Sequence, residues 1–149
     1  MKKHLCTILI FLIGCICFQS CSSPSELEGD WTCTEVQADG KQVDELNPTE
    51  QGYVGMTIKI EGNEFTRRQQ TQDLVLFNKG VVKLSSDKKT LTMTDKKIAE
   101  AYGKWRDMPK ELVIPIQFDV LELTDKKLKI RQPEKNLFGD LLIFTYQKK

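Results

Sequence analysis

The side chains best suited to chemistry gather at one end of this 149-residue chain. Four of its five cysteines, together with the single histidine, His4, lie within the first 21 residues. Histidine is the commonest general base and metal ligand near neutral pH. Its absence beyond residue 20 excludes Ser-His-Asp, Cys-His and zinc-histidine sites from that part of the chain. We therefore expect no metal, no other cofactor and no enzymatic activity.

Carboxylate pairs are the acid–base chemistry that remains. Asp119 with Glu122, and Glu61 with Glu64, lie at predicted turns or on predicted outer faces, where charged side chains are normally solvated. Two of the 22 basic residues precede residue 20, so 20 basic and 21 acidic residues follow it, a net charge of −1. Because this balance creates no field that would draw a polyanion, we expect no nucleic-acid partner.

The first twenty residues have the composition of a targeting segment. Lys2 and Lys3 precede an apolar run from Leu5 to Phe18, which is shorter than the ~20 residues that span a bilayer as a helix. A basic head, a short apolar run and then small polar residues are typical of a secretory signal peptide. We expect residues 1–20 to be removed, residues 21–26 to form a tether and residues 27–149 to fold as one domain.

A cysteine follows this segment directly. The sequence Phe18-Gln19-Ser20-Cys21, followed by serines and a proline, resembles the lipobox of bacterial lipoproteins. The resemblance implies cleavage before Cys21, attachment of palmitate-type acyl chains to that residue, and anchorage in a membrane of the cell envelope, most readily the outer membrane. Leu12-Ile13-Gly14-Cys15 is a rival site, and an ordinary cleaved signal peptide with a free Cys21 is a further alternative.

Lipidation of Cys21 would leave Cys33 as the only thiol of the folded domain. A single thiol forms no internal disulfide and no thiolate metal site. We therefore interpret Cys33 as a small buried hydrophobe.

The remaining sequence alternates between apolar and polar residues. Met56 to Glu61 is apolar at every second position, and Gly62-Asn63 is a hairpin turn signal before the next alternating segment. A change of phase at Leu121 indicates a bulge or bend. An all-β fold follows, with about eight antiparallel strands in an up-and-down barrel. The predicted strands are 29–36, 56–61, 64–70, 73–84 (with a possible break at 78–79), 90–94, 113–123, 128–132 and 141–147.

One segment departs from this pattern. Ile98, Ala101, Tyr102 and Trp105 have the i, i+3, i+4, i+7 spacing of a helical face, which predicts one short helix over about 96–106 that Pro109 would end. Such a helix would either cover the mouth of the barrel or pack Trp105 against the outer surface of the sheet.

The start of the first strand carries a short signature. Gly29-Asp30-Trp31, together with the strand and turn pattern of residues 80–92 and 121–128, resembles bacterial lipocalin-like (calycin) lipoproteins over roughly residues 27–148. The resemblance implies that Gly29 and Trp31 close one end of the barrel and that a basic residue near the last strands, with Arg131 as candidate, lies across Trp31. It also implies binding of a small apolar or amphipathic molecule.

An eight-stranded barrel is wide enough either to be filled by side chains or to hold one small ligand. Arg67 shares a strand face with Phe65 and would bind a ligand carboxylate or phosphate if it points inward; otherwise it reaches solvent at a strand end. A filled barrel would instead act as an accessory module that contacts an envelope protein or glycan. The candidate ligand-binding residues are Phe65, Arg67, Met93, Phe118 and Phe144.

Overall fold

The computed structural model describes residues 26–38, 41, 52–70, 74–100, 103–136 and 139–149. The predicted signal segment and both candidate acylation sites, Cys15 and Cys21, lie outside these residues. The strands are β1 (Gly29–Ala38), β2 (Thr57–Glu61), β3 (Glu64–Gln70), β4 (Val75–Leu84), β5 (Thr90–Glu100), β6 (Arg106–Asp107), β7 (Ile116–Leu123), β8 (Lys127–Arg131) and β9 (Leu142–Lys148).

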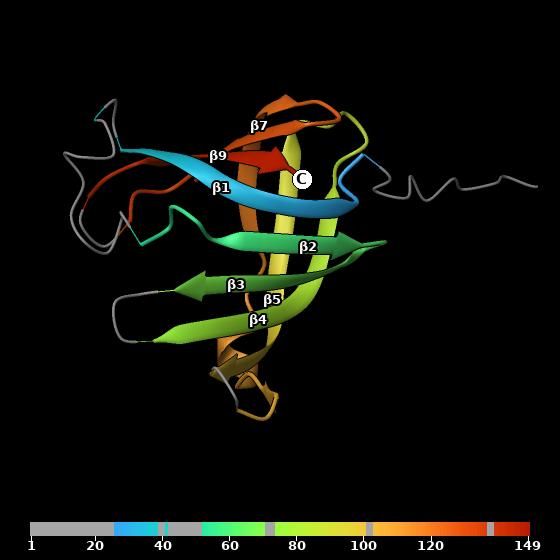
Figure 1. Ribbon diagram of the computed structural model, residues 1–149, viewed down its shortest axis with the longest axis vertical. Coiled ribbons are helices and arrows are strands. Elements are labelled where there is room, and N and C mark those ends of the chain that lie inside the picture. The colour runs from blue at the N-terminus through green and yellow to red at the C-terminus, as the bar shows by residue number, and fades with distance from the viewer. Residues whose placement is uncertain (1–25, 39–40, 42–51, 71–73, 101–102, 137–138) are drawn as a thin grey trace, which may run out of the picture.

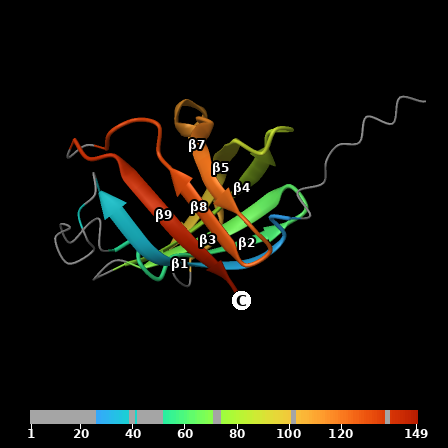
Figure 2. The same ribbon diagram turned by 90° about the horizontal axis from the view of Figure 1, so that it is seen from above.

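All strands belong to one antiparallel sheet. Its order is β4-β3-β2-β1-β9-β8-β7-β5-β6, and β4 also pairs with β5. The eight longer strands therefore close into a barrel, and the short strand β6 pairs with the last part of β5. Each of these eight strands lies beside the next one along the chain, and β9 returns to β1. Figure 1 shows β1 to β4 side by side, and Figure 2 shows β7, β8 and β9 on the other wall. The predicted eight-stranded up-and-down barrel is confirmed.

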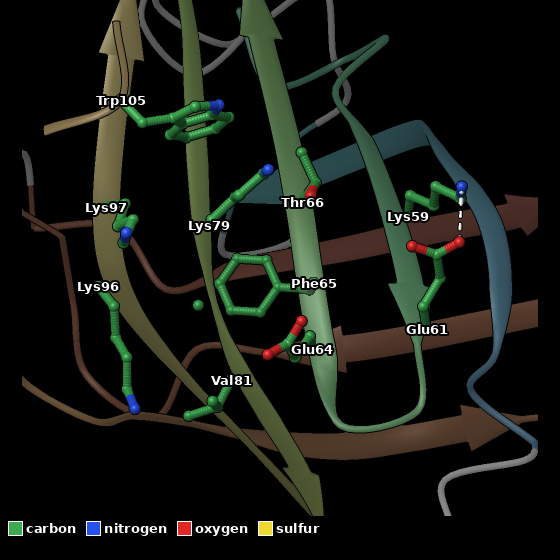
Figure 3. Close-up of a pocket in the computed structure, with 11 residues that line it drawn as sticks. Lys59, Glu61, Glu64, Phe65, Thr66, Lys79, Val81, Lys96, Lys97 and Trp105 are labelled. Atoms are coloured by element: carbon green, nitrogen blue, oxygen red, sulfur yellow. Dashed lines mark ion pairs between the residues drawn. The ribbon is translucent and has the colours of Figure 1, made fainter. Parts of the chain in front are cut away.

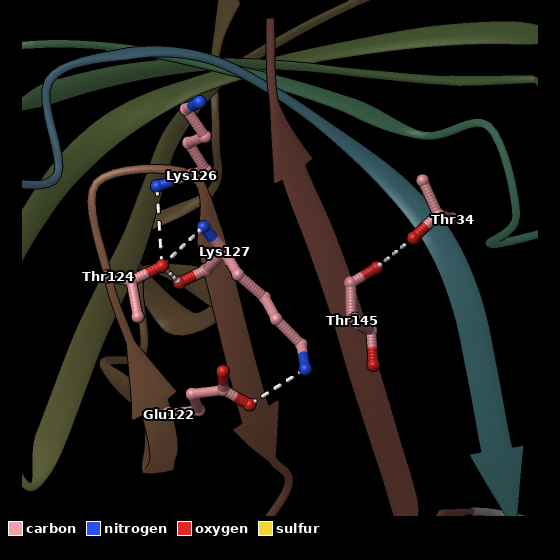
Figure 4. A network of polar contacts seen from close by, with 6 residues as sticks. All are labelled: Thr34, Glu122, Thr124, Lys126, Lys127 and Thr145. Atoms are coloured by element: carbon pink, nitrogen blue, oxygen red, sulfur yellow. Dashed lines mark hydrogen bonds and ion pairs between the residues drawn. The ribbon is translucent and has the colours of Figure 1, made fainter.

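Two local features follow directly from the sequence. Gly62 has a positive φ of 61° in the turn between β2 and β3, and the register of β7 against β8 shifts between Val120 and Glu122, as the change of phase at Leu121 predicts. The turn between β7 and β8 is stabilised by Thr124. Its hydroxyl oxygen accepts hydrogen bonds from the backbone N–H groups of Lys126 (3.3 Å) and Lys127 (2.9 Å) (Figure 4).

The predicted helix over 96–106 is wrong. Residues 96–100 continue β5, Arg106 and Asp107 form β6, and the only helical turn among the described residues is a 3₁₀ turn, Lys110–Leu112. Sheet pairing explains the difference, because Ile98 pairs with Asn78 of β4 and with Arg106 of β6. Ala101 and Tyr102 lie outside the described residues.

The barrel interior is packed with apolar side chains. Inward-facing positions of β1, β2, β8 and β9 are almost fully buried, and full burial of a large apolar side chain stabilises the fold by about 1.5–3 kcal/mol. No helix in the described part of the chain is long and apolar enough to cross a bilayer. The core cluster contains Leu27, Trp31, Cys33, Val36, Ala38, Met56, Ile58, Ile60, Phe65, Val82, Leu91, Met93, Leu128, Ile130, Leu142, Phe144 and Tyr146.

Candidate functional site

The two ends of the barrel differ in how they are closed. We call the end that holds Leu27, Trp31 and Lys148 the closed end. The opposite end, where β1 finishes and β4 and β7 begin, is the far end. The closed end is sealed by Trp31, which is 1% exposed and whose indole N–H donates to the backbone oxygen of Leu27 at 2.7 Å.

A lysine completes the closed end. The Lys148 ammonium nitrogen lies 5.0 Å from the centroid of the Trp31 ring. Gly29 has a φ of 129°, and a Cβ there would collide with the side chain of Lys148. Glycine at this position therefore lets the lysine lie across the tryptophan.

The expected partner of Trp31, Arg131, lies elsewhere. Its guanidinium is paired with Asp119 of β7, with nitrogen–oxygen distances of 2.8 and 3.1 Å. Cross-strand register explains this result, because Arg131 lies directly opposite Asp119 whereas Lys148 lies opposite Trp31. The prediction identified the type of residue but chose the wrong strand.

The predicted ligand-binding residues face the barrel interior, and most are core residues. Phe65, Met93 and Phe144 are buried, and Phe118 is partly buried against the same cluster. The rings of Phe118 and Phe144 meet edge to face, with their centroids 6.5 Å apart. These aromatic side chains therefore fill space, and Arg67 is the candidate that differs from them in chemistry.

Arg67 lies on the inner face, within a polar cluster in the apolar wall. One guanidinium nitrogen lies 2.6 Å from Oδ2 of Asp95, and the side-chain amide of Asn78 donates to the same oxygen at 3.4 Å. The Arg67 guanidinium carbon also lies 5.8 Å from the centroid of the Phe65 ring. The side chains of Arg67 and Asp95 are 19% and 16% exposed, so the ion pair is largely removed from water.

Sequence reasoning missed Asp95 and Asn78 as members of this cluster. Asp95 precedes the segment with helical spacing, which indicates a helix cap rather than an interior carboxylate. The strand register supplies the missing signal: Ile58, Arg67, Asn78 and Ile98 form one row across β2 to β5. Because Ile58 points into the core, the other side chains of its row face the same interior.

The polar cluster is not fully satisfied. Nε of Arg67 and Oδ1 of Asp95 are buried, and neither has a hydrogen-bond partner among the described residues. A buried donor or acceptor without a partner costs about 1–3 kcal/mol. The cluster thus offers one unused donor and one unused acceptor inside the barrel wall.

Two other titratable groups in the core are held neutral. Burial raises the pKa of the Cys33 thiol from 9.0 to about 12, and burial also raises the pKa of Tyr146 well above its ordinary value, with the positive charge of Arg67 acting in the opposite direction. A thiol with this pKa is protonated near neutral pH and is not a nucleophile. This finding agrees with the interpretation of Cys33 as a buried hydrophobe.

The far end carries exposed apolar side chains. Ile116 pairs with the buried Met93 and so continues the inner face of the barrel, yet it is 43% exposed. Leu112 and Ile114, which precede it, are also exposed, and Val54 and Leu74 lie just before β2 and β4 at the same end. We call these five residues the apolar rim.

Comparison of the chain with known protein-family models and with curated proteins found no match. Among the described residues, no group of three or more histidine, cysteine, aspartate or glutamate side chains is arranged to hold a metal ion.

Proposed function

We propose that this protein is a lipid-anchored, lipocalin-like lipoprotein of the cell envelope that binds a small amphipathic molecule through the far end of its barrel. The proposed role is non-catalytic, because the interior offers an ion pair and apolar walls, and its described residues include no activated nucleophile. The observation that carries the proposal is the Arg67–Asp95 pair, which leaves a buried donor and a buried acceptor unused.

The gradient of burial along the interior supports this location. The cross-strand row that begins at Trp31 continues through Ile58, Arg67, Asn78 and Ile98. Its first two members are buried, and its last three are only partly buried. Ligand sites commonly combine apolar walls with a few converging polar groups. The closed end therefore supplies a rigid base, and the far half supplies the walls and the polar contact.

The chemistry of the pair limits the class of ligand. Asp95 already neutralises the Arg67 guanidinium, so a bare anion would gain less than at an unpaired arginine. A hydroxyl, an amide or a protonated carboxylic acid can accept from Nε and donate to Oδ1 at once. We therefore expect an apolar molecule that carries one such group.

The anchor is proposed from the sequence and is consistent with the start of the domain. Leu27, six residues after Cys21, is fully buried at the closed end. The six residue steps from Cys21 to Leu27 span at most about 22 Å when extended. A lipidated Cys21 would thus keep the closed end near the membrane and direct the far end away from it.

The apolar rim favours a second candidate function, an accessory module that contacts an envelope protein. Exposed apolar surface often marks interaction sites, and five large apolar side chains at this end are exposed. In that case the Arg67–Asp95 pair would have only a structural role, and the rim would be the functional surface.

The test is native mass spectrometry and solvent extraction of the full-length protein, purified in a mild detergent. We expect a co-purifying amphipathic molecule whose occupancy falls at least severalfold in Arg67→Met. Arg68→Met is the matched control, because the neighbouring arginine faces outward and contacts Gln70. Failure to recover a small molecule from the wild-type protein, or equal loss in both variants, would reject the interior site and favour the accessory module.

The anchor has its own test. Cys21→Ala should abolish labelling by a palmitate analogue, whereas Cys15→Ala should retain it. Labelling that persists in Cys21→Ala and disappears in Cys15→Ala would move the anchor to the rival site.

A further inference from the structure

The outer surface of the barrel carries a hollow that the interior site does not use. It has a volume of about 400 Å³ and lies over β2 to β5, on the face opposite the core. Figure 3 shows Trp105 at one end of it, Glu64 toward the other, and Lys79 between them. Four lysines and two glutamates line it, so its lining has a net positive charge.

A β-bulge brings two of these lysines to the hollow. Lys79 pairs with Lys97 while Gly80 pairs with Asp95, so Lys96 is an extra residue on β5. In a regular strand, consecutive side chains point to opposite faces. The bulge instead lets both Lys96 and Lys97 line the same hollow (Figure 3). Bulges of this kind often re-aim a side chain at a functional surface.

A glycine makes the bulge sterically possible. A Cβ on Gly80 would overlap the backbone oxygen of Thr94 and crowd the ring of Phe65. A larger residue at this position would separate β4 from β5, so the backbone that positions both lysines depends on Gly80.

The central row of this surface places like charges together. Lys79 and Lys97 lie directly opposite one another on neighbouring strands, an arrangement that is destabilising by itself. Lys97 is 3.6 Å from Asp107, and Lys79 lies 4.5 Å from the centroid of the Trp105 ring. No described carboxylate lies within ion-pair distance of Lys79 or Lys96. Two ammonium groups are therefore left for an anionic partner.

The hollow continues into a second one. The second hollow, of about 590 Å³, shares Lys59, Glu61, Thr66, Lys79 and Trp105 with the first and extends to Asp30, Arg68 and Lys149. Together they form a groove across β1 to β5, and strands about 4.8 Å apart give it a width of about 19 Å. A groove that extends about 19 Å across the strands suits several units of a polymer better than one small molecule.

We propose that this groove, which we call the lysine groove, binds an acidic polysaccharide. The ammonium groups match carboxylate or sulfate substituents, and Trp105, 38% exposed, offers an aromatic surface to a sugar ring. An acidic peptide fits less well, because the strands under the groove are paired on both sides and offer no free backbone edge. The net charge of the whole domain conceals this local excess of lysine.

The experiment measures binding of oligogalacturonate to the full-length protein in detergent by calorimetry, with the methyl-esterified oligomer as the uncharged control. We expect binding of the acidic oligomer that weakens with added salt and no binding of the ester. Lys79→Gln and Lys96→Gln should each weaken the Kd about fivefold. Lys83→Gln, on β4 but outside both hollows, should leave the Kd within about twofold.

Three results would overturn the proposal. The first is no binding of oligogalacturonate to the wild-type protein. The second is an equal loss in Lys83→Gln and Lys96→Gln, which would indicate general attraction to surface charge. The third is tighter binding of polyglutamate or single-stranded DNA, which would assign the groove to another class of polymer. Arg67→Met, which alters the interior site, should leave binding of the oligogalacturonate unchanged.

Discussion

The two tryptophans of this protein have the same kind of neighbour but occupy different environments. Each has a lysine ammonium over its ring, Lys148 over Trp31 at 5.0 Å and Lys79 over Trp105 at 4.5 Å. Trp31 is buried at the closed end, whereas Trp105 is 38% exposed on the outer surface. The same cation–π contact therefore caps a packed core in one place and borders an open groove in the other.

Burial, rather than the contact itself, decides what each tryptophan contributes. Trp31 packs in the core and satisfies its indole N–H internally. Trp105 meets the ring of Phe77 edge to face, with centroids 6.5 Å apart, and leaves much of its surface in water. A half-exposed aromatic contributes less to folding and remains available for binding.

Replacement of the two tryptophans by alanine should give the largest difference. Trp31→Ala should lower the free energy of unfolding by about 3–5 kcal/mol, since it opens a cavity in a packed core and leaves the Leu27 oxygen without its donor. Trp105→Ala should cost less than about 1 kcal/mol. Urea unfolding followed by circular dichroism measures both values. Equal losses would mean that Trp105 belongs to the core.

Replacement of Gly29 tests whether the position of Lys148 over Trp31 depends on the absence of a side chain at residue 29. Gly29→Ala should cost about 2 kcal/mol, because a φ of 129° strains a residue with a side chain and the new Cβ meets Lys148. The double variant with Lys148→Ala should recover part of this loss, since it removes the collision and keeps the backbone strain. Urea unfolding of the three proteins separates the two contributions. A double variant no more stable than Gly29→Ala would mean that the collision is absent.

The barrel itself was open to prediction from the sequence because its signals are local. Alternation in Met56–Glu61, the Gly62-Asn63 turn and the change of phase at Leu121 each depend on a few neighbouring residues. Trp31 and Cys33, two apart on one strand, are both buried, as their spacing predicts. These features need no knowledge of which strands meet.

The candidate site was less predictable because it depends on register between distant strands. Arg67 meets Asp95, which lies 28 residues away along the chain, and Trp31 meets Lys148 rather than Arg131. The bulge at Lys96 interrupts the regular alternation of β5, and the apolar residues that follow it in the sequence have the spacing of a helical face. Pairing with β4 overrides that local signal.

Alkaline pH should weaken the closed end through Cys33. Above pH 9 the thiol of the unfolded chain loses its proton, while the folded thiol, with a pKa of about 12, keeps it. The contribution of Cys33 to the free energy of unfolding is therefore fully present below pH 9 and is lost as the pH rises from 9 toward 12. Near pH 10 the loss from Cys33 should be about 1 kcal/mol relative to neutral pH.

Cys33→Val isolates this contribution. Between neutral pH and about pH 10, the valine variant should lose about 1 kcal/mol less stability than the wild-type protein, because valine has no thiol to ionise. Tyr146 is buried in both proteins, so its contribution cancels in the comparison. Urea unfolding at the two pH values measures the difference. Parallel losses in the two proteins would show that Cys33 ionises as easily in the folded state as in the unfolded one.

Replacement of the two lysines should give the smallest effects and the closest comparison of the two tryptophans. Lys148→Met keeps an apolar stem over Trp31 but removes the charge, and should cost about 0.5–1 kcal/mol. Lys79→Met should be neutral or slightly stabilising, within about 0.5 kcal/mol, because it also relieves the repulsion with Lys97. Urea unfolding at low and high salt measures both changes. A loss in Lys79→Met as large as that in Lys148→Met would mean that Lys79 is held against Trp105 for stability, whereas a gain in stability would mean that the like-charged pair with Lys97 is kept at a cost to the fold.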